Sequence, residues 1–126
     1  NTSDWEDWLN ESFAEMSCLM AIRDTEGEEI FKSIVEKMRK NSQFTPPLWG
    51  FDRSGSDYEI AYNVLYNKGV CFLIDLEERV GRENFSKLFS YLSKAQLTST
   101  NQLIDTLTKL YGEEIGTWFE TMIKNR

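Results

Sequence analysis

The sequence predicts an all-α domain of about six amphipathic helices. Apolar residues recur at helical spacing along nearly the whole chain, glycines and N-capping residues separate the periodic segments, and no segment alternates apolar and polar residues as a half-buried strand does. At 126 residues the chain has the length of one ordinary domain. We therefore expect a single helical domain over 1–126, with a loop at 42–56 and helices at about 4–22, 27–41, 57–80, 82–95, 100–111 and 113–125.

The first helix carries a strip of acidic residues. Ser3 and Glu6 form a capping-box pattern, which predicts a helix start near Asp4. An apolar stripe follows at helical spacing: Trp5, Trp8, Leu9, Phe13, Met16, Leu19 and Met20. In the stretch SDWEDWLNESFAEM, three carboxylates lie one above another, and each such pair destabilises a helix by roughly 0.2–0.5 kcal/mol. These are Asp7, Glu11 and Glu15. Glu11 lies too deep in the helix for the dipole to offset this repulsion, so water, a basic partner or a metal ion must do so.

The second helix and the loop after it are both rich in apolar residues. The helix is expected to turn Ile30, Phe31, Ile34, Val35 and Met38 inward. The stretch NSQFTPPLWGFDRSGS holds both prolines and two glycines, which is typical of a loop. Its apolar residues predict that the loop packs against the body of the domain: Phe44, Leu48, Trp49 and Phe51.

The longest periodic segment runs from Asp57 to Val80 and contains a glycine in its interior. Gly69 costs a helix about 1 kcal/mol relative to alanine, so we expect it to mark the close approach of another backbone. Gly81 ends this helix, and a later helix is expected to be capped near Ser99.

Composition excludes several classes of function. The net charge of −7 and pI near 4.6 argue against nucleic-acid binding, and no apolar run is long enough to span a membrane. The chain has no histidine, which removes the commonest general base and the commonest metal ligand. Cys18 and Cys71 have no metal-binding or disulfide pattern, so we expect buried reduced thiols and a cytoplasmic protein.

Three blocks, in this order, resemble the aminopeptidase N-like zinc metallopeptidases, the gluzincins. WEDWLNESFAEM is similar to their W-x-x-x-W-L-N-E-G-F-A block, and YNVLYNKGVCFLIDLEERVG to their Y-x-K-G block. The segments ENFSKLFSYL, TSTNQLIDTL and GEEIGTWFETMI resemble the helical end of their catalytic domain. The resemblance implies that the chain is the helical lobe of a thermolysin-like metallopeptidase catalytic domain and a fragment of a larger peptidase.

The resemblance also implies roles for two residues. Glu11 corresponds to the third zinc ligand, and the other two ligands, the histidines of an H-E-x-x-H helix, would precede Asn1. Tyr66 corresponds to the tyrosine that stabilises the oxyanion of the tetrahedral intermediate. We expect peptide substrates and zinc in the full-length parent, but no zinc on this chain alone, because one carboxylate cannot hold it. The face left by the missing N-terminal lobe is a candidate dimer interface.

Two positions depart from the family pattern. Ser12 stands where glycine is usual, and we expect its side chain to sit against the zinc-bearing helix. Asn67 stands where glutamate is common, on what we expect to be an exposed turn. Either change is compatible with a divergent or degenerate homologue.

Alternatives remain open at this point. From the residues alone, Glu11, Asp7 and Glu15 are solvated carboxylates, while Tyr66 and Tyr62 are packing tyrosines of the core. A free-standing helical interaction module that has lost catalysis is a second hypothesis. A third is an enzyme that uses Glu11 and Glu15 as acid and base.

Overall fold

The structure is a computed structural model that describes residues 4–126, and these residues form helices and contain no strand. The predicted all-α class is confirmed. The elements are, in order, a 3₁₀ turn at Trp5–Asp7, α1 (Trp8–Glu26), α2 (Glu28–Ser42), a 3₁₀ turn at Arg53–Gly55, α3 (Tyr58–Tyr62), a π-helical segment at Asn63–Lys68, α4 (Gly69–Val80), α5 (Arg82–Ala95), α6 (Thr100–Tyr111) and α7 (Glu113–Asn125).

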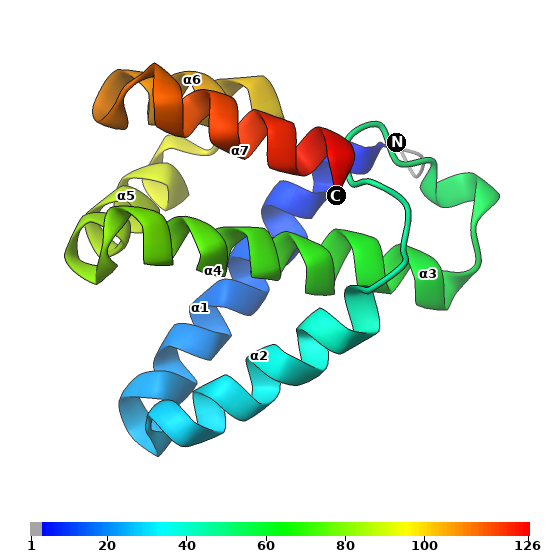
Figure 1. Ribbon diagram of the computed structural model, residues 1–126, viewed down its shortest axis with the longest axis horizontal. Coiled ribbons are helices and arrows are strands. Elements are labelled where there is room, and N and C mark those ends of the chain that lie inside the picture. Colours follow the sequence, from blue (N-terminus) through cyan, green and yellow to red (C-terminus); the bar gives the residue numbers. More distant parts are fainter. Residues whose placement is uncertain (1–3) are drawn as a thin grey trace.

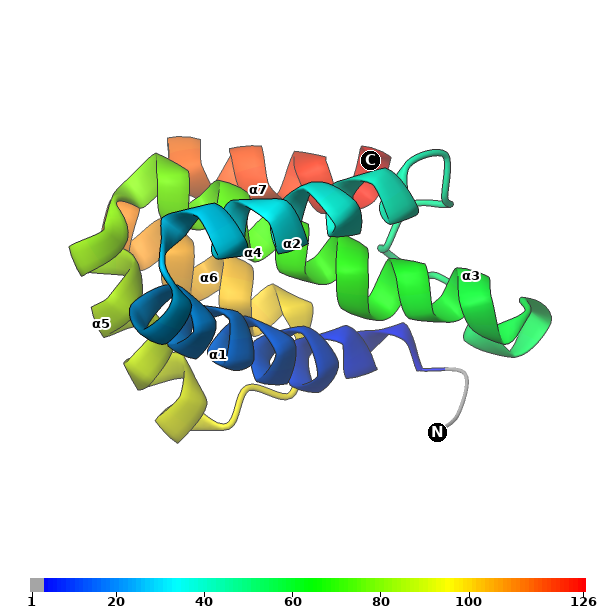
Figure 2. The ribbon, with the colours of Figure 1, turned by 90° about the horizontal axis from the view of Figure 1, so that it is seen from below.

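Helix α4 runs through the centre of the molecule. In Figure 1, α1 crosses behind α4, α2 lies below α4, α6 and α7 lie above it, and α5 closes one end; Figure 2 shows the arrangement from below. Eight of the twelve residues of α4 are buried, which fits this central position. The α1–α2 and α6–α7 hairpins turn at Gly27 and Gly112, where φ values of 97° and 100° suit glycine alone.

The first turn of the chain is tied to the start of α6. Ser3 of the expected capping box lies outside the described residues. The Asp4 carboxylate caps the first turn by accepting from the Glu6 N–H at 2.8 Å. The Glu6 carboxylate instead accepts from the Thr100 N–H at 2.5 Å, and the Trp8 indole N–H donates to the Thr100 hydroxyl at 2.9 Å. Glu6 therefore supports the N-terminus of α6 rather than its own helix.

The loop between α2 and α3 packs down as expected, except at one residue. Leu48 and Phe51 are buried, and Trp49 lies against Trp5 with ring centroids 4.9 Å apart. The prediction for Phe44 is wrong, since its side chain is 102% exposed. Its backbone has φ 62°, a left-handed conformation that turns the chain sharply after α2 and leaves the ring in solvent.

Two further side chains expected to be buried are exposed. Ile30 precedes Phe31 by one residue, which places it about 100° away around α2, so it cannot share the inward face of Phe31 and Val35. Cys18 lies on a side of α1 that no other described element covers, whereas Cys71 is buried as predicted, and both thiols are free.

A buried ion pair joins α1 to α4. The Arg23 guanidinium donates to both carboxylate oxygens of Glu77 at 2.6 and 2.8 Å, and the side chains are only 9% and 6% exposed. Arg23 also lies 4.6 Å from the centre of the Phe31 ring. Helix α1 ends at Glu26, four residues beyond the predicted end, and this pair fixes its last turns.

Glu77→Gln should lower the free energy of unfolding by about 3 kcal/mol, because it leaves the Arg23 charge buried and uncompensated. Urea denaturation followed by circular dichroism measures the change. Glu83→Gln is the matched control, since the Glu83–Lys87 pair is 86% and 76% exposed and should contribute under about 1 kcal/mol. Equal losses in the two variants would show that the buried pair contributes no more than a surface pair.

Candidate functional site

The structure brings Glu11 and Tyr66 together where α1 crosses the π-helical segment. Both side chains are half-buried. A hydrogen bond to the Glu11 carboxylate, followed by burial and the Glu11 charge, raises the pKa of the Tyr66 phenol to about 12. The phenol is therefore protonated at neutral pH, and it lies close to the Glu11 carboxylate. Among residues 4–126, the ion pairs found do not include Glu11.

The other two carboxylates of the acidic strip have different surroundings. Asp7 was expected to be solvated, but it accepts a hydrogen bond from the Arg53 guanidinium at 2.9 Å. Glu15 lies near Tyr62, where burial and then the Glu15 charge raise the pKa of that phenol. A basic partner thus offsets the repulsion at Asp7, while Glu11 faces a neutral donor.

Tyr62 stacks on Tyr66. The two ring centroids lie 4.5 Å apart with 16° between the planes, one helical turn along the chain. We had expected Tyr62 to be part of the core, but its side chain is half-buried. The stack restricts the movement of the Tyr66 ring on the face that Tyr62 covers.

Gly69 is closely approached, but by the side chains of Ser12 and Trp8 rather than by the backbone that we expected. A Cβ atom on Gly69 would lie 1.9 Å from the Ser12 hydroxyl oxygen and 3.0 Å from the Trp8 ring. Ser12 is fully buried, and its hydroxyl donates to the Leu65 carbonyl at 2.6 Å. The prediction that Ser12 sits against another, zinc-bearing helix is wrong, because its side chain faces the segment that carries Tyr66.

The two residues after Tyr66 are buried as well. Asn67 is 5% exposed, and its side-chain amide donates to the side-chain Oδ1 of Asn63 at 2.9 Å, so the predicted exposed turn is also wrong. The Lys68 ammonium donates to the carbonyls of Thr45 and Pro46 at 3.1 and 2.8 Å and to that of Arg126. Burial lowers the pKa of Lys68 to about 8. These bonds fasten the loop and the end of α7 to the Tyr66 segment.

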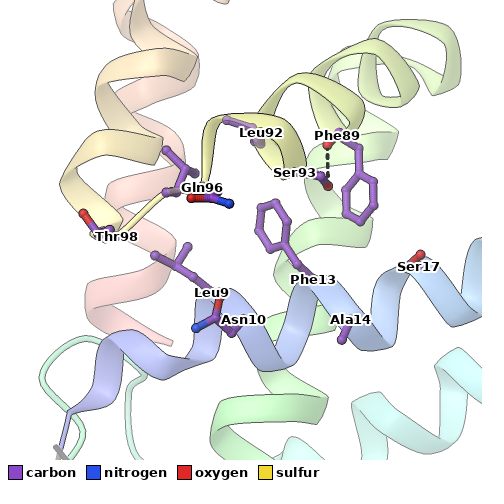
Figure 3. A pocket seen from close by; sticks show the side chains of 11 residues that line it. Leu9, Asn10, Phe13, Ala14, Ser17, Phe89, Leu92, Ser93, Gln96 and Thr98 are labelled. Carbon is purple, nitrogen blue, oxygen red and sulfur yellow. Dashed lines mark hydrogen bonds between the residues drawn. The ribbon is translucent and has the colours of Figure 1, made fainter.

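A groove of about 590 Å³ lies between α1 and α5, away from Glu11 (Figure 3). Phe13 and Phe89 stack in it at 5.2 Å between centroids. Phe13 follows Glu11 by two residues, which turns it about 200° around α1. The eleven lining residues include no charged side chain, so the groove offers no acid, base or anionic ligand for catalysis.

The described residues hold neither a complete metal site nor a membrane span. No group of three His, Cys, Asp or Glu side chains in residues 4–126 is placed to hold a metal ion. None of the helices in that range is both long and apolar enough to cross a bilayer. Any metal bound at Glu11 therefore needs further ligands from elsewhere.

The fold and these side chains define a helical lobe that presents one carboxylate and one neutral phenol at a shared position. A family model described as the peptidase family M1 domain matches residues 1–122, and the chain belongs to this family. Comparison with curated proteins and with solved structures gives no match. The resemblance in the sequence is confirmed at the level of the family, which indicates a peptidase.

Periodicity and motifs indicated Glu11 and Tyr66, but the sequence did not predict three contacts around them. Arg53 gave no signal, because a lone arginine in a loop has no fixed partner in sequence. The hydrogen bond from Ser12 to Leu65 spans 53 residues, which no local pattern reports. Tyr62 could have been paired with Tyr66 from its i,i+4 spacing.

Glu11→Gln should lower the pKa of Tyr66 from about 12 toward the ordinary value near 10, because the charged acceptor is lost. In the unsubstituted chain, the Tyr66 phenol has a higher pKa in the folded than in the unfolded state. Its contribution to stability is therefore fully present below pH 10 and is lost as the pH rises through about 12. NMR titration of ring-labelled tyrosine measures the pKa. Glu120→Gln, a surface change on α7, should leave it unchanged; an unshifted Tyr66 in Glu11→Gln would contradict the contact.

Proposed function

We propose that this chain is the helical part of the catalytic domain of a zinc-dependent aminopeptidase, which removes N-terminal residues from peptides. Glu11 would be the third zinc ligand, and Tyr66 would donate a hydrogen bond to the oxyanion. The observation that carries the proposal is the meeting of these two side chains, 55 positions apart in sequence, at one position. Membership of the peptidase family M1 supports it.

The surroundings of Glu11 fit a metal ligand. The carboxylate is half-buried, points to a neutral donor, and has no cation among its contacts in residues 4–126, so its negative charge is available to a dication. Two histidines from a preceding H-E-x-x-H helix would complete the ligand set. Zinc held there would supply a polarised carbonyl and an activated water.

Tyr66 has the chemistry that an oxyanion donor needs. Its phenol keeps the proton at neutral pH because Glu11 and burial hold the pKa at about 12. A donor that stays neutral and is fixed by the Tyr62 stack can hydrogen-bond a developing negative charge without reorganising. Its role would be to hold the oxyanion, while the general base would come from the preceding motif.

A face of α1 beside Glu11 supports the expected contact with a further lobe. Three small side chains, Ala14, Cys18 and Ala21, are exposed on it at helical spacing. Apolar residues therefore surround most of α1, which is typical of a helix covered on more than one side. We infer that the segment bearing the histidines packs on this face.

The test is the gene extended upstream of Asn1, expressed and assayed with aminoacyl anilides with and without a chelator. The wild-type protein should bind one zinc and lose activity with the chelator. Tyr66→Phe should keep the zinc and lower kcat by roughly 10²–10³-fold, because one oxyanion donor is lost. Glu11→Gln should lose zinc as well as activity. Full activity in Tyr66→Phe would exclude its role.

The isolated chain should contain no stoichiometric zinc and show no peptidase activity, because Glu11 alone cannot hold the ion. Metal analysis by mass spectrometry after dialysis measures this. One tightly bound zinc per chain would overturn the division of ligands between two segments.

A second candidate is a non-catalytic interaction module of the same family. The uncharged groove between α1 and α5 favours it, because a lining of apolar and uncharged polar side chains suits a protein partner. An H-E-x-x-H motif upstream of Asn1 would support the peptidase, and its absence would support the module. A cytoplasmic location remains a prediction from the two free thiols.

A further inference from the structure

We propose that Ser12 is a positioning residue whose hydroxyl, by holding the Leu65 carbonyl, fixes the π-helical segment so that Tyr66 faces Glu11. The inference deepens the proposed function, on which its catalytic meaning rests. Ser12 follows Glu11 directly, and Leu65 precedes Tyr66 directly. A single 2.6 Å hydrogen bond from the Ser12 side chain to the Leu65 carbonyl therefore links the residue next to Glu11 with the residue next to Tyr66.

The hydrogen bond takes up a carbonyl that the helix would otherwise use itself. In a regular α-helix the Leu65 carbonyl accepts from the Gly69 N–H. Here the Gly69 N–H donates to the Tyr66 carbonyl, and the Leu65 carbonyl accepts from Ser12. The Gly69 bond has the i→i−3 spacing of a 3₁₀ turn, so the hydrogen-bond spacing changes where the π-helical segment meets α4, beside the carbonyl that Ser12 holds. The turn sets the direction of the Tyr66 side chain relative to α4.

Gly69 provides the space that the Ser12 hydroxyl occupies. Any Cβ at position 69 would lie 1.9 Å from that oxygen, so the hydroxyl fills the place a larger residue would take. Ser12 is fully buried, and the hydroxyl has this one acceptor at short distance. Since the peptidases that the chain resembles carry glycine at this position, the serine adds an anchor that their motif does not contain.

The test compares Ser12→Ala with Ser17→Ala in the 126-residue chain by NMR. Ser17 is an exposed serine on the same helix and controls for the loss of a hydroxyl from α1. Ser12→Ala should speed amide hydrogen exchange at residues 66–70 by roughly tenfold and weaken the nuclear Overhauser contact between the Tyr66 ring and the Glu11 side chain. Exchange at Leu103 and Leu107 of α6 should not change. Identical results for the two variants would overturn the proposal.

A second pair of variants separates hydrogen bonding from packing. Gly69→Ala should clash with Ser12, and Ser12→Gly should relieve this clash in the double variant. If packing alone positions Tyr66, the double variant Ser12→Gly/Gly69→Ala restores the contact between Tyr66 and Glu11. The proposal expects the fold to recover while the contact stays weak, and a restored contact would overturn it.

The same changes in the upstream-extended enzyme give a readout that a general loss of stability would not produce. Ser12→Ala should lower kcat about tenfold with KM and zinc content unchanged, because only the oxyanion donor is displaced. Loss of zinc together with kcat would overturn the assignment to Tyr66. If the contact changes in the isolated chain but the extended protein has no peptidase activity in any form, the positioning role stands and the proposed function fails.

Discussion

The close crossing of α1 and the segment from Leu65 to Gly69 is the constraint on which the rest of the site depends. The absence of a side chain at Gly69 lets the Trp8 ring and the Ser12 hydroxyl approach α4, and both are completely buried there. A helix pair held at this distance has little freedom to slide, because each shift would push Ser12 or Trp8 into backbone. The crossing therefore fixes which residues of α1 face the π-helical segment. Glu11 lies beside Tyr66 because of this contact, and Tyr62, one turn before Tyr66, stacks on its ring.

The same crossing places three carboxylates of one helix in three electrostatic surroundings. Asp7 meets a guanidinium, Glu11 meets a neutral phenol, and Glu15 lies near a second phenol. The Arg53 guanidinium offsets the charge of Asp7, whereas the neutral Tyr66 phenol leaves Glu11 outside the ion pairs found in residues 4–126. Under the proposed function, this uncompensated charge is what a dication would bind.

Much of the fold could be predicted from the sequence, because helical periodicity and glycine stops are local signals. The end of α4 at Gly81 and the N-cap of α6 at Ser99 illustrate this, since each depends on residues within one turn. The π-helical segment could not be predicted, because it depends on Ser12, 53 residues before Leu65. The burial of Asn67 and Lys68 was missed because burial depends on contacts distant in sequence, such as those of Lys68 with the loop and the end of α7. Glu11 and Tyr66 were located by family motifs, but their contact and the Arg53 partner of Asp7 are tertiary facts.

The proposed contact with a further lobe would account for why one side of α1 carries small exposed residues. Helix α1 buries Trp8 and Ser12 against α4, and beside Glu11 it exposes Ala14, Cys18 and Ala21. Small side chains allow a second helix to approach within the short distance at which its own side chains reach the Glu11 carboxylate. A long side chain at any of these positions would hold that helix away. Under the proposed function, the crossing with α4 on one side of Glu11 and a partner helix on the other would act on the same carboxylate. A ligand supplied from both sides is what a metal held between two segments requires.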